Sequence, residues 1–463
     1  MKTIFKKIAA GLVLSSALLP AQAQEFRTSY FMQTSNFRHQ MNPALIDAPY
    51  VSFPFMGNIN VGATGNMGYK NFIYKLEGNP LYDQTTFMSP TVSASDFLGG
   101  LHDKNRADIY VNYNLFSVGF RGFKGMNVVE LNLRSNTNIT LPYELFEFMK
   151  TAGEKEFYQL HDIGARSQNY MELALGHSHR INDRLTVGAK AKFFFGVAYA
   201  DFKVNQLNLT MNGDEWRVQG DARLKASVLK SEFDYEGPEK NAPDGRRRVK
   251  GLDDVSFGMP GFGMAFDLGA SYKVMDDLTV SAGLTDLGFI SWGKTKQASS
   301  AGDYTFSGFN NIYAGSNNTG SNKLGDQFED LGDDLEEMFS VYDDGETSTT
   351  QALAATLNVG AEYTLPMYRR LHFGFLYTGR IHGLYSYHQA MLSATVRPVN
   401  PIEISVNTTA GGTGCSLGAA LSLKAKHFNF YVGSDRILGK VNKQFIPLNN
   451  LNANVNFGMT FPL

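Results

Sequence analysis

The last thirteen residues of the chain, 451–463, alternate strictly between two kinds of side chain. Leu451, Val455, Phe457 and the other odd positions are apolar, whereas asparagine, glycine, threonine and proline occupy the even positions. This period of two predicts a β-strand with one wholly apolar face. At the edge of a soluble sheet such a strand would promote aggregation. We therefore expect its apolar face to contact lipid and both edges to be paired, as in a transmembrane barrel.

The end of this segment resembles the C-terminal signal by which outer-membrane barrels are recognised for insertion. The signal residues would be Asn456, Gly458, Phe461 and Leu463, which implies the barrel-assembly machinery as a partner. Pro462 departs from the pattern because it removes a hydrogen-bond donor from the ladder, a loss that strand ends tolerate.

The first residues of the chain have the organisation of a secretory signal peptide. Three lysines precede an apolar run over 8–19, and Ala21 and Ala23 supply the small residues of a cleavage site. We expect residues 1–23 to be removed and the mature chain to begin at Gln24. Beyond them no window approaches 18 uninterrupted apolar residues, which excludes helical membrane spans. The expected location is the outer membrane of a Gram-negative bacterium, in contact with its lipid and lipopolysaccharide.

Composition agrees with a β-protein and narrows the function little. Aromatic residues make up 13% of the chain and glycine occurs 46 times, which suits strands, turns and aromatic belts. The single cysteine, Cys415, cannot form an intramolecular disulfide. A net charge of −2 argues against a nucleic-acid partner. Nothing in the sequence calls for a cofactor.

The segment 169–197 predicts the clearest hairpin. A three-residue connection, Asn182-Asp183-Arg184, would pair Leu175 with Ala191 and Leu173 with Phe193, so that one face is apolar. The other face then carries charged residues, which we assign to the lumen of the barrel. The same parity extends to the strand predicted over 126–138. The lumen-facing charged residues from these strands would be Glu130, Arg134, Glu172, Lys190 and Lys192.

A second hairpin is predicted over 203–228, with its turn near Gly213 and Asp214. Arg217, Asp221, Arg223 and Lys225 share one face of its return strand, opposite a row of small and apolar residues. Buried unpaired charges would cost several kcal/mol each, so this face needs water, and we place it in the lumen as well. The strands are longer than a membrane crossing requires, which predicts that they project beyond the outer surface.

Two long polar loops interrupt the strands, at 231–260 and 292–351. The first contains Arg246, Arg247 and Arg248, which could contact lipopolysaccharide phosphates, although a solvated loop face is the more economical interpretation. In the second, apolar residues recur at helical spacing among many carboxylates over 324–342, which predicts an acidic amphipathic helix. A calcium site is the sharper alternative, but the spacing does not fit an EF-hand, so no metal is assigned.

These observations predict an all-β fold: a transmembrane antiparallel barrel of about 14 strands, within a range of 12 to 18. Residues 58–463 would form the barrel, and 24–57 a plug-like segment without a long strand. The closing strand would pair with an early strand near 58–76, beside the plug.

The candidate catalytic and metal-binding motifs are better explained by structural roles. Gly414-Cys415-Ser416-Leu417-Gly418 matches a hydrolase nucleophile motif, yet Ser416 lies in an alternating strand rather than at a strand-to-helix turn. His177 and His179 share a face but lack a third ligand. Cys415 has the parity of a packing residue. We therefore expect no enzyme; an outer-membrane hydrolase using Ser416 or Ser178 is the least favoured hypothesis.

Four stretches resemble known barrels, in two separate resemblances. "NLFSVGFRGFKGMNVVELNLRSN", "YMELALGHSHRINDRLTVGAKAKFFFGVAYA" and "FDLGASYKVMDDLTVSAGLTDLGFISWG" are similar to an outer-membrane barrel family labelled a domain of unknown function. Asn42-Pro43-Ala44-Leu45 resembles the N-terminal hatch of long-chain fatty-acid-transporter-like barrels and of barrels associated with type IX secretion. The second resemblance implies that Asn42, Pro43, Ala44 and Leu45 form a plug that binds a ligand.

Two functions remain open at this point. The first is passive transport of a hydrophobic or amphipathic small molecule, which would bind beside the plug and displace it. The alternative is a non-transporting barrel that binds secretion-system or surface proteins through its long loops.

Overall fold

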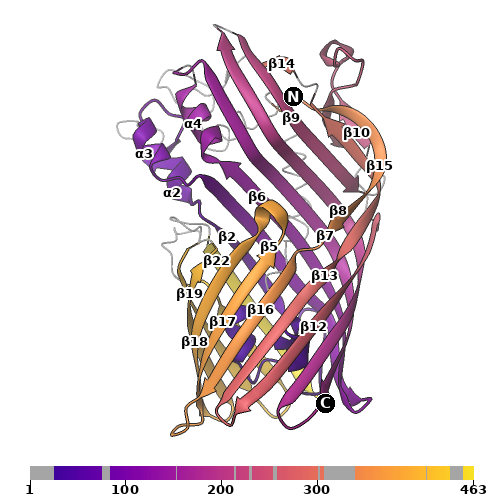
Figure 1. The fold of residues 1–463 in the computed structure, drawn as a ribbon, viewed down its shortest axis with the longest axis vertical. Helices are drawn as coiled ribbons and strands as arrows, with labels where there is room; N and C mark the ends of the chain where they lie inside the picture. The colour runs from indigo at the N-terminus through magenta and orange to yellow at the C-terminus, as the bar shows by residue number, and fades with distance from the viewer. Residues whose placement is uncertain are drawn as a thin grey trace.

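The computed structural model describes residues 26–75, 84–152, 154–212, 215–228, 232–253, 258–300, 303–306, 339–412, 414–437 and 452–463. They form a closed antiparallel barrel of 14 strands, which confirms the predicted fold (Figure 1). In ring order the strands are β2 (Ile59–Gly65), β5 (Lys104–Gly122), β6 (Gly125–Pro142), β7 (Phe157–Arg180), β8 (Leu185–Asn212), β12 (Gly261–Met275), β13 (Leu278–Ser299), β16 (Ala355–Thr364), β17 (Leu371–Ile381), β18 (Tyr387–Val399), β19 (Ile402–Gly411), β20 (Ser416–Lys424), β21 (Asn429–Ser434) and β22 (Asn452–Pro462).

The last strand closes the ring against the first. β22 pairs with β2, joining Val455 to Val61, and β21 pairs with its other edge, joining Val432 to Phe457. Side chains of β22 alternate as predicted: Asn456 is fully buried inside, while Val455 is 55% exposed outside. The hairpin of β7 and β8 likewise has the predicted register, with Leu175 opposite Ala191 and Leu173 opposite Phe193.

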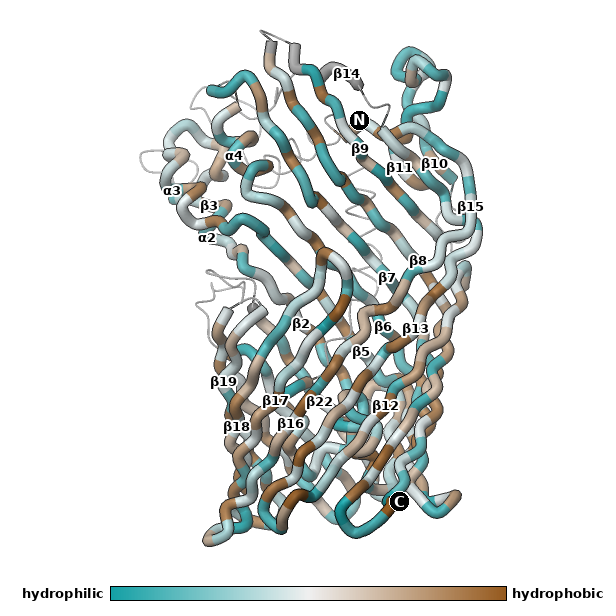
Figure 2. The backbone as a smooth tube through the Cα atoms, viewed as in Figure 1, coloured by the Kyte–Doolittle hydropathy of each residue, from teal (hydrophilic) through white to brown (hydrophobic). Residues whose placement is uncertain are grey.

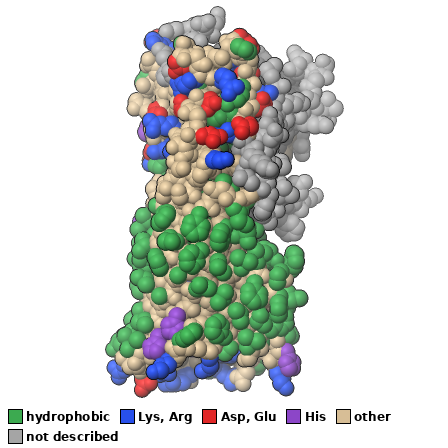
Figure 3. All heavy atoms as spheres, turned by 90° about the vertical axis from the view of Figure 1, so that its right-hand side faces the viewer, with side chains coloured by type: hydrophobic (Ala, Val, Ile, Leu, Met, Phe, Trp, Pro, Cys, Tyr) green, Lys and Arg blue, Asp and Glu red, His purple; other side chains and the backbone are tan. Residues whose placement is uncertain are grey.

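Short turns connect the strands at the end where the chain terminates, and longer segments connect them at the other end (Figure 1). In single-chain barrels the short turns are periplasmic and the long loops extracellular. We use these two terms for the two ends. The outer surface of the lower half is a continuous apolar band (Figure 3). It includes Leu175, Phe266, Leu287, Leu392 and Val406, each at least 45% exposed. Among the described residues, no helix has the length and apolarity of a membrane span.

Several strands continue above this band as an extracellular extension (Figures 1 and 2). β8 pairs with β12 up to Gly196, and from Ala198 onward its partner is β9 (Glu215–Val228). β13 changes partners in the same way, from β16 to β15 (Tyr342–Ala352), and β14 (Asp303–Phe306) pairs with β9. Smaller elements join the extension: β10 (Glu232–Tyr235), β11 (Val249–Asp253), β3 (Ile73–Lys75), β4 (Gln84–Thr86), α2 (Tyr69–Phe72), α3 (Ala94–Leu98), α4 (Tyr143–Thr151) and the 3-10 helix η4 (Pro238–Lys240).

One hydrophobic cluster holds the extension together. It contains Phe97 from α3, Phe148 from α4, Leu209 from β8, Val218 from β9 and Phe233 from β10, all buried. The amide of Asp96 bonds to the hydroxyl of Ser93, which caps α3 in the usual way for serine. The burial of these side chains gives the extension its own core, separate from the membrane-embedded wall.

Some sequence predictions differ from the structure. The region near 58–76, where an early strand was predicted, contains β2 and then the helix α2, and the loop predicted over 231–260 contains β10, η4 and β11. The loop predicted over 292–351 contains the upper part of β13, all of β14 and most of β15. The acidic helix predicted over 324–342 lies outside the described residues except for 339–342, where Tyr342 begins β15.

The chain before β2 occupies the interior of the barrel. Three 3-10 helices, η1 (Arg27–Phe31), η2 (Arg38–Gln40) and η3 (Pro43–Leu45), lie within the ring, and we call residues 26–49 the plug. The wall begins earlier than the predicted boundary at residue 58, because β1 (Tyr50–Ser52) pairs with both β5 and β22. After β1, Phe53 and Phe55 point outward, 47% and 83% exposed, before β2 continues the wall.

Candidate functional site: the plugged lumen

The Asn42-Pro43-Ala44 step is the point of closest packing between the plug and the wall. Asn42 caps η3 by accepting a hydrogen bond from the Ala44 amide, and its side-chain amide donates to the Ala270 carbonyl of β12, 3.2 Å away. The Ser178 hydroxyl of β7 donates to the Ala44 carbonyl. These contacts satisfy the polar atoms of the step with wall groups.

Glycines of the wall make this approach possible. A Cβ atom on Gly269 would lie 2.1 Å from Asn42 Oδ1, and one on Gly188 would lie 2.3 Å from the Pro43 carbonyl carbon. Gly283 similarly faces Met41 and Asn42. No side chain fits between the plug and these strands. Asn42, Pro43, Ala44 and Leu45 therefore anchor the plug in this structure, and the ligand binding expected of these four residues stays a prediction.

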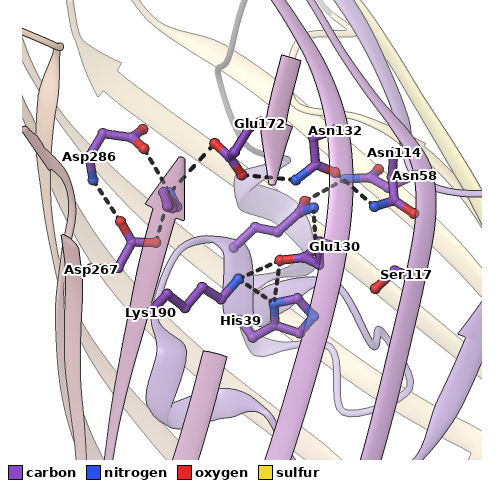
Figure 4. Close-up of polar contacts among 12 residues, drawn as sticks. His39, Asn58, Asn114, Ser117, Glu130, Asn132, Glu172, Lys190, Asp267 and Asp286 are labelled. Carbon is purple, nitrogen blue, oxygen red and sulfur yellow. Dashed lines mark hydrogen bonds and ion pairs between the residues drawn. The ribbon is translucent and has the colours of Figure 1, made fainter. Parts of the chain in front are cut away.

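A buried ion pair joins the next part of the plug to the wall (Figure 4). Lys190 Nζ of β8 lies 2.7 Å from Glu130 Oε2 of β6, and each side chain is only 1% exposed. Lys190 also donates to His39 Nδ1, 2.9 Å away. Because an ammonium has no acceptor, Nδ1 accepts and Nε2 carries the proton that is donated to Tyr50. His39 is thus a neutral bridge between Lys190 and Tyr50, while Gln40 of the plug donates to Glu130.

A second charged group lies beside the first and extends to the neighbouring strands β7, β12 and β13 (Figure 4). Lys192 Nζ is 2.7 Å from both Asp267 of β12 and Asp286 of β13, and 3.9 Å from Glu172 of β7. Arg134 of β6 completes the group by pairing with Glu172 and Asp286. Glu172, Lys192 and Arg134 were predicted to face the lumen, whereas Asp267 and Asp286 were missed. Each charge has an opposite neighbour, which offsets the cost of burial.

Two carboxylates on the opposite side of the barrel bind the backbone of the plug. Glu403 of β19 accepts hydrogen bonds from the amides of Gln33 and Thr34 and from the Thr34 hydroxyl. Asp435 accepts from the amides of Arg27 and Thr28 and from the Thr28 hydroxyl. Hydrogen bonds to a charged acceptor are about twice as strong as neutral ones. The plug is thus fastened on both sides of the ring.

The connection between β17 and β18 closes the lumen from above. This segment, 382–386, contains the 3-10 helix η5 (Gly383–Tyr385), and we call it the strap. It reaches the far wall: Arg106 of β5 donates to the Ser386 carbonyl, and the Arg166 guanidinium of β7 lies 5.6 Å from the centre of the Tyr385 ring. β17 and β18 stand across the ring from β5 and β7. The strap therefore crosses the barrel.

Polar side chains with unpartnered atoms lie on the inner faces of β6 and β7, above the residues that contact the plug. Asn136, Asn138 and Thr140 share the face of Glu130 on β6, and Gln168 lies opposite Asn136 on β7. All are at least 97% buried, yet the Asn136 and Asn138 side-chain oxygens, Thr140 Oγ1 and Gln168 Nε2 have no hydrogen-bond partner among the residues that the structure describes. Buried polar atoms normally have one, from protein, water or ligand. We call these four residues and His382 the polar layer.

His382 contributes to this layer from the strap. It is 5% exposed, and within the described part of the chain neither ring nitrogen has a hydrogen-bond partner. Burial, together with the nearby cationic Arg380 and Arg166, lowers the pKa of His382 to about 3. The ring is therefore neutral at physiological pH and offers one donor and one acceptor toward the lumen.

Four predicted lumen residues lie elsewhere. Arg217, Asp221, Arg223 and Lys225 belong to β9, which pairs with β8 only above the end of β12. They are on the extracellular extension rather than in the enclosed lumen, and Arg223 is 63% exposed in its pair with Asp221. Their shared parity was read correctly from the sequence, but parity carries no information about height along the barrel.

The residues of the candidate catalytic and metal motifs lie in or beside strands of the barrel. Ser416 begins β20, buried, with its hydroxyl bonded to Thr409 and to the Asp435 carbonyl. His177 and His179 lie in β7, and His177 bonds to Asn127. Cys415 is exposed. Among the described residues, no group of three histidine, cysteine or acidic side chains is arranged to hold a metal ion.

Comparison with known proteins finds similar solved structures and one matching protein family. Solved structures that are similar include the toluene transporter TodX of Pseudomonas putida, with 10% identity over 92% of this chain and 93% of that chain and a TM-score of 0.41. The toluene transporter TbuX of Ralstonia pickettii has 8% identity over 91% of this chain and 90% of that chain and a TM-score of 0.40. A FadL homologue of Pseudomonas aeruginosa has 12% identity, coverages of 92% and 91%, and a TM-score of 0.34.

No curated protein matches the sequence. The family described as "Family of unknown function (DUF5723)" matches residues 43–435, which span the plug step, the wall and the strap. This agrees with the family resemblance seen in the sequence, and the chain belongs to that family.

Proposed function

We propose that the protein is an outer-membrane barrel that admits a small amphipathic molecule to the space between the plug and the strap. The observation that carries the proposal is the polar layer, whose buried atoms lack partners. A ligand with hydroxyl, amide or carboxyl groups would supply those partners. A pure hydrocarbon would not supply them. The polar layer therefore favours amphipathic ligands over purely hydrophobic ones.

The connection between plug and strap supports a gated path. Arg27, at the start of the plug, donates to the Tyr387 hydroxyl and to Gln389, 2.9 and 3.0 Å away. Tyr387 follows the strap directly in the sequence. A ligand that moves the strap therefore also changes the contacts of the plug, and passage would follow release of the plug from Asp435 and Glu403.

Tryptophan fluorescence provides a direct test. Trp292 is fully buried and stacks on Tyr199, whose hydroxyl bonds to Asp201, the ion-pair partner of Arg166 beneath the strap. With the other tryptophan replaced, Trp216→Phe, a brominated monoacylglycerol should quench Trp292 saturably. A brominated alkane of the same length should not.

Variants of the polar layer sharpen this test. Replacing Asn136 and Gln168 with leucine should weaken the affinity for the monoacylglycerol, measured by its quenching, about thirtyfold, since two polar contacts of about 1 kcal/mol each are lost. The same double variant should not lower the resistance of the barrel to unfolding, because it removes unpartnered buried atoms. Asn205→Leu, on the exposed extension, is the control and should change neither property. Equal binding of the alkane, or the absence of saturable quenching, would reject the proposal.

The extracellular extension supports a second candidate, a barrel that binds secretion-system or surface proteins. Its hydrophobic cluster forms a compact head above the membrane band, which a simple pore does not need. Cross-linking on intact cells through residues of this head, followed by capture of the barrel, would test the idea. Recovery of no protein above the level of an uncross-linked control would count against it.

A further inference from the structure

The periplasmic rim of the barrel carries a ring of basic side chains directly below the apolar band (Figure 3). Each short turn at this end contributes to it. The basic residues are Arg121 and Lys124 between β5 and β6, Arg180 and Arg184 between β7 and β8, Lys273 before the β12–β13 turn, Arg369 and Arg370 between β16 and β17, Arg397 before the β18–β19 turn, and Lys424 and Lys426 at the β20–β21 turn.

Few carboxylates balance these charges. Asp183, Asp276 and Asp277 pair with Arg180, Lys273 and Arg369 respectively. Arg121, Lys124, Lys424 and Lys426 are exposed and form no ion pair with any described residue. The rim is therefore strongly positive although the whole chain has a net charge of −2.

An exposed apolar side chain accompanies the basic residues in most of these turns. Phe123 is 83% exposed beside Arg121 and Lys124, and Met367 is 88% exposed beside Arg369 and Arg370. Ile181, Met275 and Val399 repeat the arrangement in other turns, at 55%, 55% and 46% exposure. Apolar side chains this exposed are costly in water and favourable at the boundary of the acyl region.

We propose that this rim binds the anionic phospholipid headgroups of the periplasmic leaflet. The rim lies directly below the apolar band, whose side chains face the acyl chains of the membrane. The headgroups of the same lipids must therefore lie at the height of the turns. Arginine and lysine bind phosphate through charge-assisted hydrogen bonds, and each basic side chain near an anionic surface strengthens association about fivefold. The apolar residues of the turns anchor the rim at the depth where these contacts form.

A protein partner fits the rim less well. An acidic protein would need to cover basic residues distributed around the full circumference. Phospholipids of the periplasmic leaflet surround the barrel and can reach basic residues on every side of it. The exposed apolar residues in successive turns also follow the membrane boundary rather than forming one contiguous patch.

The test uses purified full-length protein in a neutral detergent, titrated with phosphatidylglycerol or with phosphatidylcholine. Native mass spectrometry counts bound lipid, and thermal unfolding measures stabilisation. Phosphatidylglycerol should bind and raise the unfolding temperature at low salt, and 1 M NaCl should remove most of the effect because salt screens exposed charges. Phosphatidylcholine should have little effect.

Charge-removal variants separate the rim from other lipid contacts. The rim variant replaces Arg121, Lys124, Lys424 and Lys426 with glutamine, and should bind phosphatidylglycerol roughly 600-fold more weakly, at about fivefold for each of the four side chains. A matched control replaces four basic residues of the extracellular part with glutamine: Lys70, Lys155, Arg223 and Arg247.

The control variant should keep the wild-type response to phosphatidylglycerol. An unchanged response in the rim variant would overturn the proposal, and so would equal effects of the two lipids. Loss of a co-purified acidic protein in the rim variant, without any change in lipid binding, would overturn it in favour of a protein partner. None of these readouts involves the polar layer, so the proposed transport function stands or falls separately.

Discussion

At the scale of single residues, the Glu130–Lys190 pair is the strongest candidate for holding the plug. Both groups are almost completely buried, and Gln40 and His39 of the plug bond to them. Glu130→Ala would leave the Lys190 ammonium without its carboxylate, a change that costs about 3–5 kcal/mol for buried pairs. We expect faster amide hydrogen exchange over residues 38–46 in this variant, measured by mass spectrometry.

The matched variants distinguish loss of the charge balance from general damage. Asp183→Ala removes one partner of the surface pair with Arg180 and should leave the plug unchanged, because solvent screens that pair. Replacing Glu130 and Lys190 together with methionine removes both buried charges and should restore much of the protection. If Glu130→Ala exchanges like the wild type, the pair does not hold the plug.

The contact between wall glycines and the plug step gives a second prediction at this scale. Gly269→Ala places a methyl group 2.1 Å from Asn42 Oδ1 and 2.9 Å from Pro43 Cδ, so the plug or β12 must move. We expect chemical cross-linking or proteolysis to detect a looser plug in a barrel that still folds. Gly293→Ala on β13 is the control, because its only close neighbour would be the Pro260 carbonyl oxygen at an ordinary 3.6 Å. Equal proteolysis of the two variants would contradict the packing argument.

Which residues of the site could be foreseen depends on their local sequence. Glu172 and Lys192 sit in strands where charged and apolar residues alternate, so parity alone placed them diagonally on one face. Asp267 and Glu403 also alternate with outward apolar residues, so their strands place them on the inner face, but the sequence does not show that they bind Lys192 and the plug amides. His39 and Asp435 depend on how the plug folds into the ring, which no period in the sequence encodes.

At the scale of elements, the strap is the part most sensitive to pH. Its His382 is neutral because burial, Arg380 and Arg166 lower its pKa to about 3, and the other groups around it are Tyr385 and the Arg166–Asp201 pair. When the strap opens, the ring gains water and its pKa returns to about 6.5. The open state therefore binds more protons between these values, and acid favours opening.

The size of this effect follows from the ordinary histidine pKa. Lowering the pH from 7.5 to 5.5 should raise the open population of the strap about tenfold. Hydrogen exchange of the strap amides, corrected for the intrinsic pH dependence of exchange, measures the population. His382→Gln should remove the pH dependence while the strap remains in place. A tenfold change that persists in that variant would assign the effect to another group.

Elements with a regular period were predictable, and those defined by tertiary contacts were not. The closing strand β22 was placed within one residue at each end because a lipid-facing strand must alternate. The helices α2 and α3 are four and five residues long, too short to show a period of 3.6. β1 was assigned to the plug because a three-residue strand leaves no pattern; its pairing with both β5 and β22 defines it.

At the scale of the whole molecule, the closed ring and the plug are separable. The 14 strands complete their pairing without residues 26–49, because β1 and β2 join β5 to β22 directly. Hydrogen bonding around a closed ring leaves no unpaired edge in the membrane, which is the source of barrel stability. Deleting residues 26–49 should therefore leave a folded barrel, checked by its resistance to heat and detergent.

That deletion should convert a closed protein into an ion-conducting pore. Glu130, Lys190, Glu403 and Asp435 would then face water where they now bind the plug. We expect the wild type to show little current in planar bilayers and the deletion variant to show steady conductance. Combining the deletion with removal of the strap should raise the conductance further, because the strap crosses the same lumen above the plug. A folded deletion variant that conducts no more than the wild type would mean that the strap alone seals the barrel, and the plug would then serve ligand binding rather than closure.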